Sequence, residues 1–435
     1  MKFLGLASIA LAFFSAASLS AQDISGDWQG TLNAGKELRT ILKISKSEAG
    51  ELKATLYSID QTPTGMAVSS IAFHDAMLSF SIGDLGLSYH GTLSADGQSI
   101  SGSLTQGKTF PLVFQRATPQ TEWKIDVSPH KIQFVPVDKD VSLEVLDWGG
   151  TGRPLIFLAG LGDDAHVFDT FAPKFVSAYH VYGITRRGFG KSSAPAPDCS
   201  GNYSAHRLGD DVLAVMDALK IDRPVLVAHS FGGEELSSIG TRFPGKVAGL
   251  IYLDAGYPYA FYNDYAAEGF AVNDVVQVRN ELTRLLAPSS PPGERKAIVQ
   301  HLHDVSLPRL DKDFVTLQKD LQSIPAYAPS PPDTPAVRIN AAMVQDEQLY
   351  TGVKVPVLAF FAVPHAVPQP PGMSEADYKA RIAEDLVRTG TQADAFEAGN
   401  PTARVIRLPN ANHYVFRSNE DEVIRAMNAF LARLP

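Results

Sequence analysis

Apolar and polar positions alternate in short segments between residues 23 and 117. Segments such as GDWQGTL, LRTILKIS, LKATLYS and FPLVFQRA recur about every ten residues, with Gly, Asp and Ser between them. A period of two places successive side chains on opposite faces of a strand, and the close spacing favours antiparallel neighbours. The pattern therefore predicts a small antiparallel β-domain, built as a barrel or a sandwich.

A second pattern begins at residue 131, after a Pro-containing linker over residues 118–130. Near-continuous apolar runs alternate there with stretches long enough for amphipathic helices. The runs are HKIQFVPV, VSLEVLDWGG, PLIFLAG, YHVYGIT, PVLVAHS, VAGLIYLD, VPVLAFFAV and ARVIRLP. Strands that are apolar on both faces are typical of a parallel sheet covered by helices on both sides. We therefore predict a doubly wound, mostly parallel α/β domain over residues 131–435.

The longest interval between two of these runs covers about residues 256–353 and contains helical and Pro-rich sequence. Connections within doubly wound sheets are usually short, and an insert of this length is commonly a functional element at the carboxyl edge of the strands. We therefore predict a helical lid over that edge.

Residues 1–21 combine Lys2, an apolar stretch and a series of small residues that ends at Ala21, which is the pattern of a secretory signal peptide. We expect an exported protein, periplasmic or secreted, with no stable membrane span once this segment is removed. The sequence contains one cysteine, Cys199, so no intrachain disulfide can form.

Composition and charge narrow the class of partner. With 435 residues, of which 45% are hydrophobic and 20% charged, the chain can build the cores of two domains. Its formal net charge is −9, which argues against nucleic acid or an anionic membrane surface as the main partner. A small-molecule partner is the expectation that remains, and the oligomeric state is left open.

The stretch VLVAHSFGGEELS, over residues 225–237, leads from a buried type of strand through Ser230 directly into a helix. A sharp turn at this point raises the hydroxyl clear of the backbone, and the helix N-terminus offers its dipole and free N–H groups to developing negative charge. This context favours a nucleophile over a simple helix cap.

From Pro129 to Pro435 the chain resembles the α/β-hydrolase family. The family's G-x-S-x-G elbow reads AHSFG here, with Ala228 at the first glycine position, and TRRGFGKSS is similar to its Arg-Gly-x-Gly-x-Ser turn. The resemblance implies a serine hydrolase in which Ser230 is the nucleophile and His413, in the loop after the last strand, is the base.

The resemblance is less complete for the acid that orients the histidine. The family often places an Asp just past the strand VPVLAFF, but this chain continues AVPHAVPQPPG without a carboxylate. Asp254, at the end of the preceding strand, corresponds to the acid of some relatives, such as one haloalkane dehalogenase subgroup, and we expect it to serve here. Glu375, Asp377 or a dyad assisted by water are the alternatives.

By the same resemblance, FLAGLGDDAHVF forms the oxyanion loop, and the backbone N–H groups of Leu161 and Phe231 stabilise the tetrahedral oxyanion. Aromatic residues after Asp254 are candidates for an apolar acyl pocket beneath the lid. They are Tyr257, Tyr259, Phe261 and Tyr262. His301 and His303 lack partners at metal-ligand spacing, so we expect neither a metal nor another cofactor.

A serine nucleophile fits acyl transfer, whereas dehalogenases and epoxide hydrolases of this fold use an aspartate. We therefore expect hydrolysis of apolar carboxylic esters through an acyl-serine intermediate, with amides, lactones and activated C–C bonds as alternative substrates. GDWQGTL also resembles the opening strand of lipocalins, which hold apolar ligands. A non-catalytic protein that binds apolar ligands on a hydrolase scaffold is therefore a further alternative.

Overall fold

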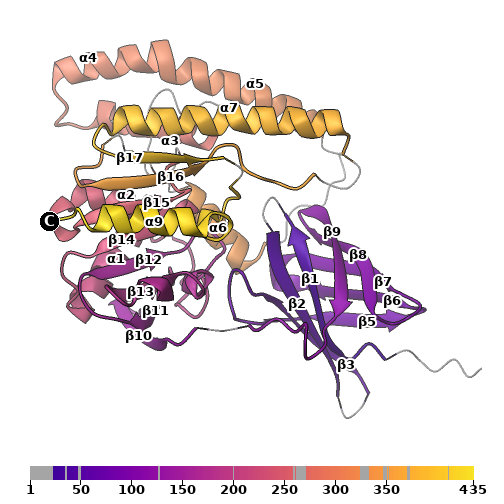
Figure 1. Cartoon of the computed structure of the whole chain (residues 1–435). Helices are drawn as coiled ribbons and strands as arrows, with labels where there is room; N and C mark the ends of the chain where they lie inside the picture. Colours follow the sequence, from indigo (N-terminus) through magenta and orange to yellow (C-terminus); the bar gives the residue numbers. More distant parts are fainter. Residues whose placement is uncertain are drawn as a thin grey trace, which may run out of the picture.

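The protein consists of a β-domain followed by an α/β domain (Figure 1). The computed structural model describes residues 23–34, 37–47, 50–125, 128–198, 200–257, 260, 271–323, 333–345, 350, 352–369, 373–409 and 411–435. The expected signal peptide and Cys199 lie outside these ranges.

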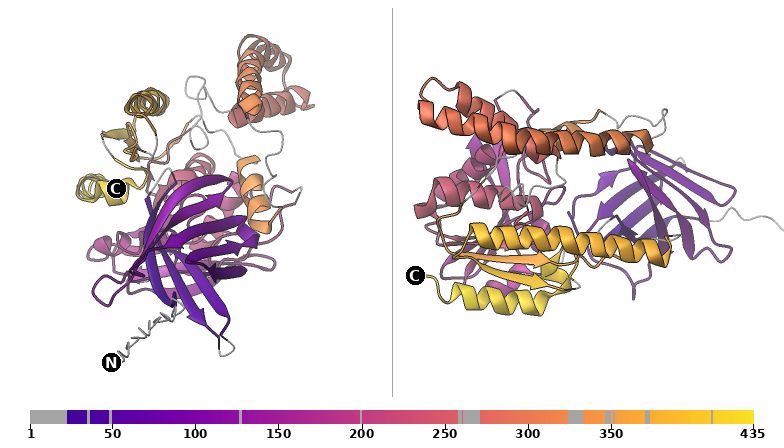
Figure 2. Two further views of the ribbon diagram at one scale, coloured as in Figure 1. Left: turned by 90° about the vertical axis from the view of Figure 1, so that its right-hand side faces the viewer. Right: turned by 90° about the horizontal axis from the view of Figure 1, so that it is seen from above.

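The first domain is a single antiparallel sheet in the order β4-β3-β2-β1-β9-β8-β7-β6-β5. Its strands are β1 (Gly26–Asn33), β2 (Glu37–Lys46), β3 (Leu52–Ser58), β4 (Met66–Ala67), β5 (Ser70–His74), β6 (Met77–Ile82), β7 (Leu87–Leu93), β8 (Ser99–Gln106) and β9 (Lys108–Arg116). Figure 2 shows the sheet curling around its inner face, so it is one curved sheet and not a sandwich of two. Trp28 is fully buried inside it, and its indole Nε1 donates to the carbonyl of Ile24 at 2.9 Å.

The second domain is built on an eight-stranded sheet in the order β10-β11-β13-β12-β14-β15-β16-β17. The strands are β10 (Lys131–Asp138), β11 (Val141–Gly149), β12 (Pro154–Leu158), β13 (His180–Ile184), β14 (Val225–His229), β15 (Gly249–Leu253), β16 (Val357–Ala362) and β17 (Arg404–Leu408). β10 and β11 pair antiparallel, while β12 to β17 pair parallel with their neighbours among themselves. Each of the eight predicted apolar runs forms one of these strands, and the predicted fold class is confirmed.

Helices cover both faces of this sheet. The helices are α1 (Ala205–Leu219), α2 (Gly233–Arg242), α3 (Ala271–Leu286), α4 (Pro292–His301), α5 (Leu307–Ser323), α6 (Pro335–Gln345), α7 (Glu375–Gly399), α8 (Val415–Ser418) and α9 (Glu420–Leu431). One apolar core joins the sheet to α8 and α9, and the other joins its opposite face to α1, α2 and α7. Strands covered on both faces explain why their sequences are almost continuously apolar.

The predicted lid segment contributes α3, α4, α5 and α6 between β15 and β16. α6 is the part that reaches the predicted nucleophile elbow, because its Ile339 and Met343 pack in one apolar cluster with Phe231. The sequence around Ser230 is therefore covered by an element that comes from the insert.

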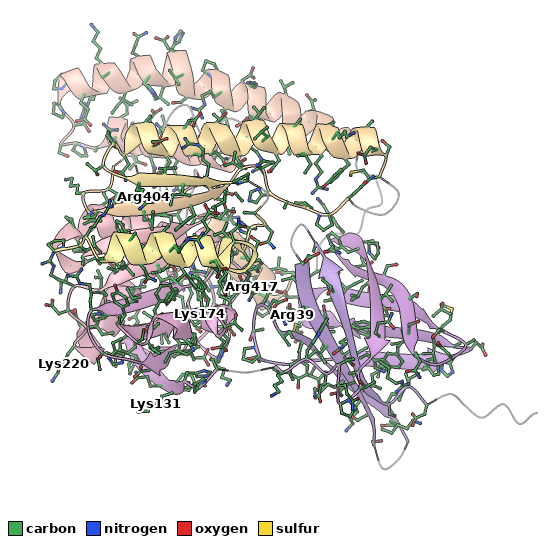
Figure 3. The ribbon with its side chains drawn as sticks, in the orientation of Figure 1. Arg39, Lys131, Lys174, Lys220, Arg404 and Arg417 are labelled. Atoms are coloured by element: carbon green, nitrogen blue, oxygen red, sulfur yellow. The ribbon has the colours of Figure 1, made fainter. Side chains whose placement is uncertain are left out.

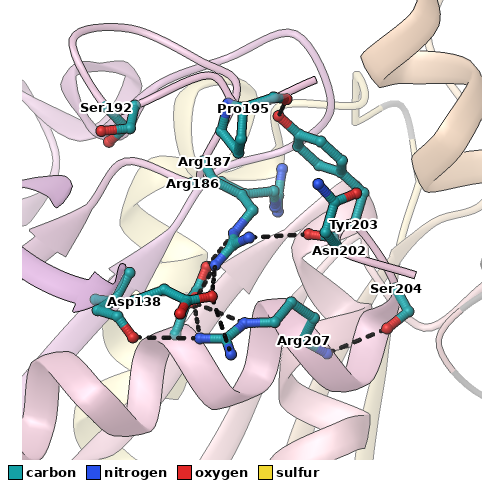
Figure 4. Close-up of polar contacts among 12 residues, drawn as sticks. Asp138, Arg186, Arg187, Ser192, Pro195, Asn202, Tyr203, Ser204 and Arg207 are labelled. Atoms are coloured by element: carbon teal, nitrogen blue, oxygen red, sulfur yellow. Dashed lines mark hydrogen bonds and ion pairs between the residues drawn. The ribbon is translucent and has the colours of Figure 1, made fainter. Parts of the chain in front are cut away.

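A buried ion-pair network lies beneath the TRRGFGKSS turn (Figure 4). The guanidinium of Arg187 donates to both carboxylate oxygens of Asp211, at 2.6 and 2.7 Å, and to the carbonyl of Asn202 at 3.1 Å. Arg207 donates to the same carboxylate from the next turn of α1. Because Arg187 and Asp211 are both buried, each charge depends on the other for the solvation that water would otherwise provide.

Replacing Asp211 by asparagine should lower the free energy of unfolding by about 3–5 kcal/mol, because it leaves the charge of Arg187 buried without its partner. Urea unfolding measures this. The matched control is Asp210→Asn, whose side chain is 42% exposed and pairs with Arg242 at 2.8 Å. That exposed pair should contribute at most about 1 kcal/mol, so equal losses for the two variants would contradict the account.

Candidate active site

Ser230 lies on a sharp turn between β14 and α2, at the carboxyl edge of the sheet. Its φ of 50° is in the left-handed region, which an L-residue adopts only under constraint. The turn is tightly packed, because a Cβ added to Gly233 would meet the carbonyl oxygen of Ala255 at 2.1 Å. Ala228, at the first glycine position of the motif, is fully buried. The small residues around Ser230 are therefore required by close contacts, and the turn has the geometry of a nucleophile elbow.

Asp254 follows β15 at the same edge and also has a positive φ, 51°. Its carboxylate is fully buried, and Oδ1 accepts a hydrogen bond from the backbone N–H of Ala362 at 2.8 Å. Oδ2 lies 2.7 Å from Nδ1 of His413. The carboxylate is therefore fixed by one oxygen and faces the histidine ring with the other.

The two alternative acids lie elsewhere in the structure. Glu375 is largely exposed at the start of α7 and pairs with Lys379 at 3.2 Å. The carboxylate of Asp377 accepts a hydrogen bond from Ser374 Oγ at 2.7 Å, and the backbone N–H of Asp377 donates to the same hydroxyl oxygen at 3.1 Å. Both residues belong to the N-terminal turn of α7, and the carboxylate that contacts His413 is Asp254.

His413 stands in the loop after β17, with its side chain 24% exposed. The backbone carbonyl of His413 lies 3.0 Å from Nε2 of His229, the residue before Ser230, and the two rings are 4.6 Å apart. His229 itself is buried and stacks on Tyr414 at 4.6 Å. His229 therefore holds the histidine loop against the strand end that carries Ser230.

His365 is a site residue that the sequence interpretation did not single out. Its Nε2 lies 2.8 Å from Asp254 Oδ2 and 2.9 Å from the hydroxyl of Tyr257. Its Nδ1 lies 3.1 Å from Asp385 Oδ2 on α7, and its backbone N–H donates to the same oxygen at 2.7 Å. The signal was its position: it follows β16 closely, within AVPHAVPQPPG, where an acid was expected and absent.

The carboxylates on either side of His365 set the charge of this cluster. Burial alone would lower the pKa of the imidazole, but Asp254, and then Asp385, outweigh it and raise the pKa of His365 to about 9. Burial likewise opposes ionisation of Asp254, yet the charge of His365 and hydrogen bonds from His365 and His413 hold its pKa well below the usual value. Asp254, His365 and Asp385 together therefore carry one net negative charge beside His413.

This arrangement predicts that stability falls as the pH rises from 6.5, the ordinary histidine value, through about 9, the value in the folded protein. The folded state binds a proton at His365 that the unfolded chain has lost, so the advantage exists below this range and disappears above it. Thermal melting between pH 6 and 10 measures the effect. His365→Gln should flatten the slope relative to wild type, and the exposed control His303→Gln should not. An unchanged slope in His365→Gln would remove this charge assignment.

The predicted oxyanion loop lies directly against the elbow. A Cβ added to Gly160 would come within 3.0 Å of both the Ser230 Cβ and the His229 Nδ1. Leu161 and Phe231, the two predicted backbone donors, pack in the same apolar cluster. The structure therefore brings the two predicted donor residues together, and Phe231 directly follows Ser230 in the chain.

A second buried ion pair, between Arg186 and Glu235, holds the oxyanion loop in place. The sequence interpretation did not identify this role. Arg186 donates to the carbonyls of Ala159 at 2.8 Å and Gly160 at 3.3 Å, and to Glu235 at 2.5 Å. The guanidinium lies 5.3 Å from the ring of Phe231. Glu235, in the first turn of α2, therefore fixes Arg186 against the loop.

Of the predicted pocket aromatics, Tyr257 is described and is buried. Its hydroxyl contacts His365, and its ring centre lies 6.4 Å from that of His413. Tyr259, Phe261 and Tyr262 fall outside the described residues.

Among the residues that the structure describes, two clusters have donor atoms close enough to hold a metal ion: Asp254 with His365 and His413, and His130 with His166 and Asp169. In the first, the carboxylate oxygen is within hydrogen-bonding distance of both rings, 2.8 and 2.7 Å, which is an acid–base arrangement. In the second, Asp169 contacts His166 at 2.7 Å and also accepts from the hydroxyl of Ser128.

Within the described ranges, no helix combines the length and apolar character that a membrane span requires.

Comparison with known proteins agrees with the fold of the second domain. Residues 153–317 match the model of a family described as the alpha/beta hydrolase fold. A fluoroacetate dehalogenase from Burkholderia sp is 32% identical over 118 residues, which cover 27% of this chain and 38% of that protein. The 3-oxoadipate enol-lactonase 2 of Acinetobacter baylyi is 33% identical over 114 residues, 26% of this chain and 41% of that protein. The chain thus spans less than half the length of these curated relatives.

Among solved structures, an epoxide hydrolase of Bacillus megaterium in complex with an inhibitor aligns with 69% of this chain and 100% of its own, at 20% identity and a TM-score of 0.43. The family match covers the elbow and the oxyanion loop, and the strand order agrees with the fold. The second domain of this chain therefore has the alpha/beta hydrolase fold.

Proposed function

We propose that the chain is an exported serine hydrolase that cleaves carboxylic esters through an acyl-serine intermediate. The observation that carries the proposal is the 2.7 Å contact between Asp254 and His413 at the sheet edge where Ser230 stands on its strained turn. Nucleophile, base and orienting acid would then come from three separate strand ends in the parallel part of one sheet.

In the proposed reaction, Ser230 Oγ attacks the ester carbonyl while His413 Nε2 takes its proton. Asp254 holds the ring with Nδ1–H toward the carboxylate and stabilises the imidazolium. The N–H groups of Leu161 and Phe231 donate to the oxyanion. His413 then returns the proton to the departing alcohol. In the second half of the reaction His413 takes a proton from water, which attacks the carbonyl of the acyl-serine. The bond to Ser230 Oγ then breaks, and His413 returns the proton to this oxygen.

The serine also determines which chemistry is favoured among hydrolases of this family. An acyl group on a serine oxygen can be released by water at the same carbonyl carbon, which suits esters and their cyclic form, lactones. The lactonase relative from Acinetobacter baylyi supports including lactones in this class.

The test is a panel of p-nitrophenyl esters of graded acyl length, assayed beside lactones and amides. The proposal expects turnover of esters, with an optimum at one acyl length set by the pocket. Hydrolysis of amides without any ester or lactone would replace the reaction class, and binding of apolar ligands without turnover would favour the non-catalytic alternative.

A further inference from the structure

The β-domain touches the second domain at the two loops that carry the proposed machinery. Part of this contact is made by the turn over residues 58–62, at the end of β3. Gln61 donates from Nε2 to Asp163 Oδ1 at 3.1 Å, and its carbonyl accepts from the backbone N–H of Asp164 at 3.2 Å. Asp163 and Asp164 lie immediately after the oxyanion loop residues Leu161 and Gly162.

The side chain of Gln61 is oriented toward Asp163 by a hydrogen bond within its own turn. Ser58 Oγ donates to Gln61 Oε1 at 2.7 Å, which directs the amide nitrogen toward Asp163. The turn is closed by backbone hydrogen bonds from Gln61 and Thr62 to the carbonyl of Ser58, at 2.9 and 3.0 Å. The donor is therefore presented by a rigid turn and not by a mobile side chain.

Asp163 connects this turn to the serine and histidine. Its side chain is fully buried, and both of its oxygens accept from the hydroxyl of Tyr414, at 3.2 and 3.1 Å. Oδ2 also lies 3.8 Å from Nδ1 of His229. Tyr414 and His229 are the sequence neighbours of His413 and Ser230, so the Asp163 carboxylate faces the side chains of the residues next to both.

The same turn holds the other side of the histidine loop. Arg417, on α8, donates to the carbonyl of Asp60 at 2.8 Å and lies 3.3 Å from its carboxylate (Figure 3). Arg417 also donates to the carbonyl of Val167 at 2.9 Å and lies 4.8 Å from the ring of Tyr414. Asp60 is itself held by Arg39 of β2 at 2.6 Å. Two consecutive residues of the β-domain therefore contact both the oxyanion loop side and the histidine side of the site.

We propose that the β-domain is a positioning element of the active site, in which Gln61 holds Asp163 so that the oxyanion loop and the His413 loop keep their places relative to Ser230. The inference rests on the proposed function. A shift of the loop alters the hydrogen bond to the oxyanion, which forms only as the carbonyl becomes tetrahedral. Loss of Gln61 should therefore act on kcat, with little change in KM.

The experiment compares Gln61→Ala, Gln61→Glu and Gln61→Asn in the full chain, with a p-nitrophenyl ester as substrate. Gln61→Ala should lower kcat about 10- to 100-fold with KM within about twofold, since small misplacements of catalytic groups carry effects of that size. Gln61→Glu keeps the size of the side chain but turns an acceptor toward Asp163, so it should not restore kcat. Gln61→Asn is too short to reach Asp163 and should match the alanine variant, which it replaces if that variant does not fold.

The control is Gln106→Ala, which removes another glutamine of the β-domain whose amide donates to the carbonyl of Leu85. It should keep wild-type kcat. Restoration of kcat by Gln61→Glu would indicate a packing role and overturn the inference, as would wild-type kcat in folded Gln61→Ala or Gln61→Asn.

Labelling of Ser230 by a fluorophosphonate separates this inference from the proposed function. A wild type that is neither labelled nor active on esters would refute the proposed function and this inference with it. A wild type that is labelled and active, with Gln61 variants equally fast in labelling and turnover, would refute the positioning role alone. The inference expects slower labelling in the Gln61 variants than in Gln106→Ala.

Discussion

Replacing Ser230 by alanine should reduce kcat for ester hydrolysis on the order of 10⁶-fold, the size of effect seen when a serine nucleophile is removed from a triad. The reason is that Ser230 is the covalent nucleophile of the proposed mechanism. It lies on a turn with a φ of 50°, a strained backbone conformation that an ordinary surface serine would not require. Steady-state hydrolysis of a p-nitrophenyl ester measures the loss, and pre-steady-state kinetics should show no acyl-enzyme burst.

The matched control for this variant is Ser200→Ala. Ser200 is an exposed serine of the same domain that donates to Asp198, and its loss should leave kcat unchanged. If Ser230→Ala retained more than about one hundredth of wild-type kcat, the residual would exceed what an oxyanion hole and binding supply, and Ser230 could not be the nucleophile.

Replacing Asp254 by asparagine should lower kcat about 10⁴-fold, the effect expected when the orienting acid of a triad can no longer hold the histidine in the reactive tautomer. The loss should be large here because the Asp254 carboxylate is within hydrogen-bonding distance of three groups: the N–H of Ala362 and the rings of His413 and His365. An asparagine offers one acceptor oxygen and an amide that donates, so at least one of the two histidines must turn away. Steady-state kinetics with circular dichroism separates this loss from unfolding.

The informative comparison is with Asp377→Asn and Glu375→Gln, the acids that sequence alone left as alternatives. Both residues belong to the first turn of α7, and Glu375 is largely exposed. Both substitutions should leave kcat at the wild-type level. Near-normal turnover in Asp254→Asn, or a large loss in Asp377→Asn, would assign the acid elsewhere.

The positions of the candidate site residues at strand ends could be predicted because an apolar run and the residue after it are recognisable in a short stretch of sequence. Ser230, Asp254 and His413 each follow an apolar run, and the carboxyl ends of parallel strands meet at one edge of the sheet. His365 obeys the same rule after β16. Its position could be predicted from the sequence, whereas its bridge to Asp385 could not, because that partner lies within a long helix with no pattern that marks it.

The supports of the site depend on contacts between distant parts of the chain. Gln61 and Asp163 are separated by 102 residues and by a domain boundary, and Arg186 and Glu235 by 49. Composition and periodicity describe the element to which a residue belongs, but they do not state which side chains face each other when two elements pack. The β-domain could therefore be predicted as a fold, while its contact with the active-site loops required the structure.

The position of Asp254 depends both on the strand end where it lies and on a contact with the neighbouring strand. A residue at the tip of β15 is tied to β16 by the N–H of Ala362, and this tie orients the carboxylate toward the next strand end in the sheet. β17 pairs with β16 on its other side, and the loop after β17 carries His413. An acid one strand earlier can thus reach the same histidine, since the strands converge at the edge where both loops begin.

The most direct measurement is covalent labelling of the folded protein with a fluorophosphonate, followed by mass spectrometry of its peptides. The account predicts one adduct, on Ser230, formed in wild type, absent from Ser230→Ala and strongly slowed in Asp254→Asn. A folded protein that takes no adduct, or takes it at another residue, would contradict the assignment of Ser230 as the nucleophile.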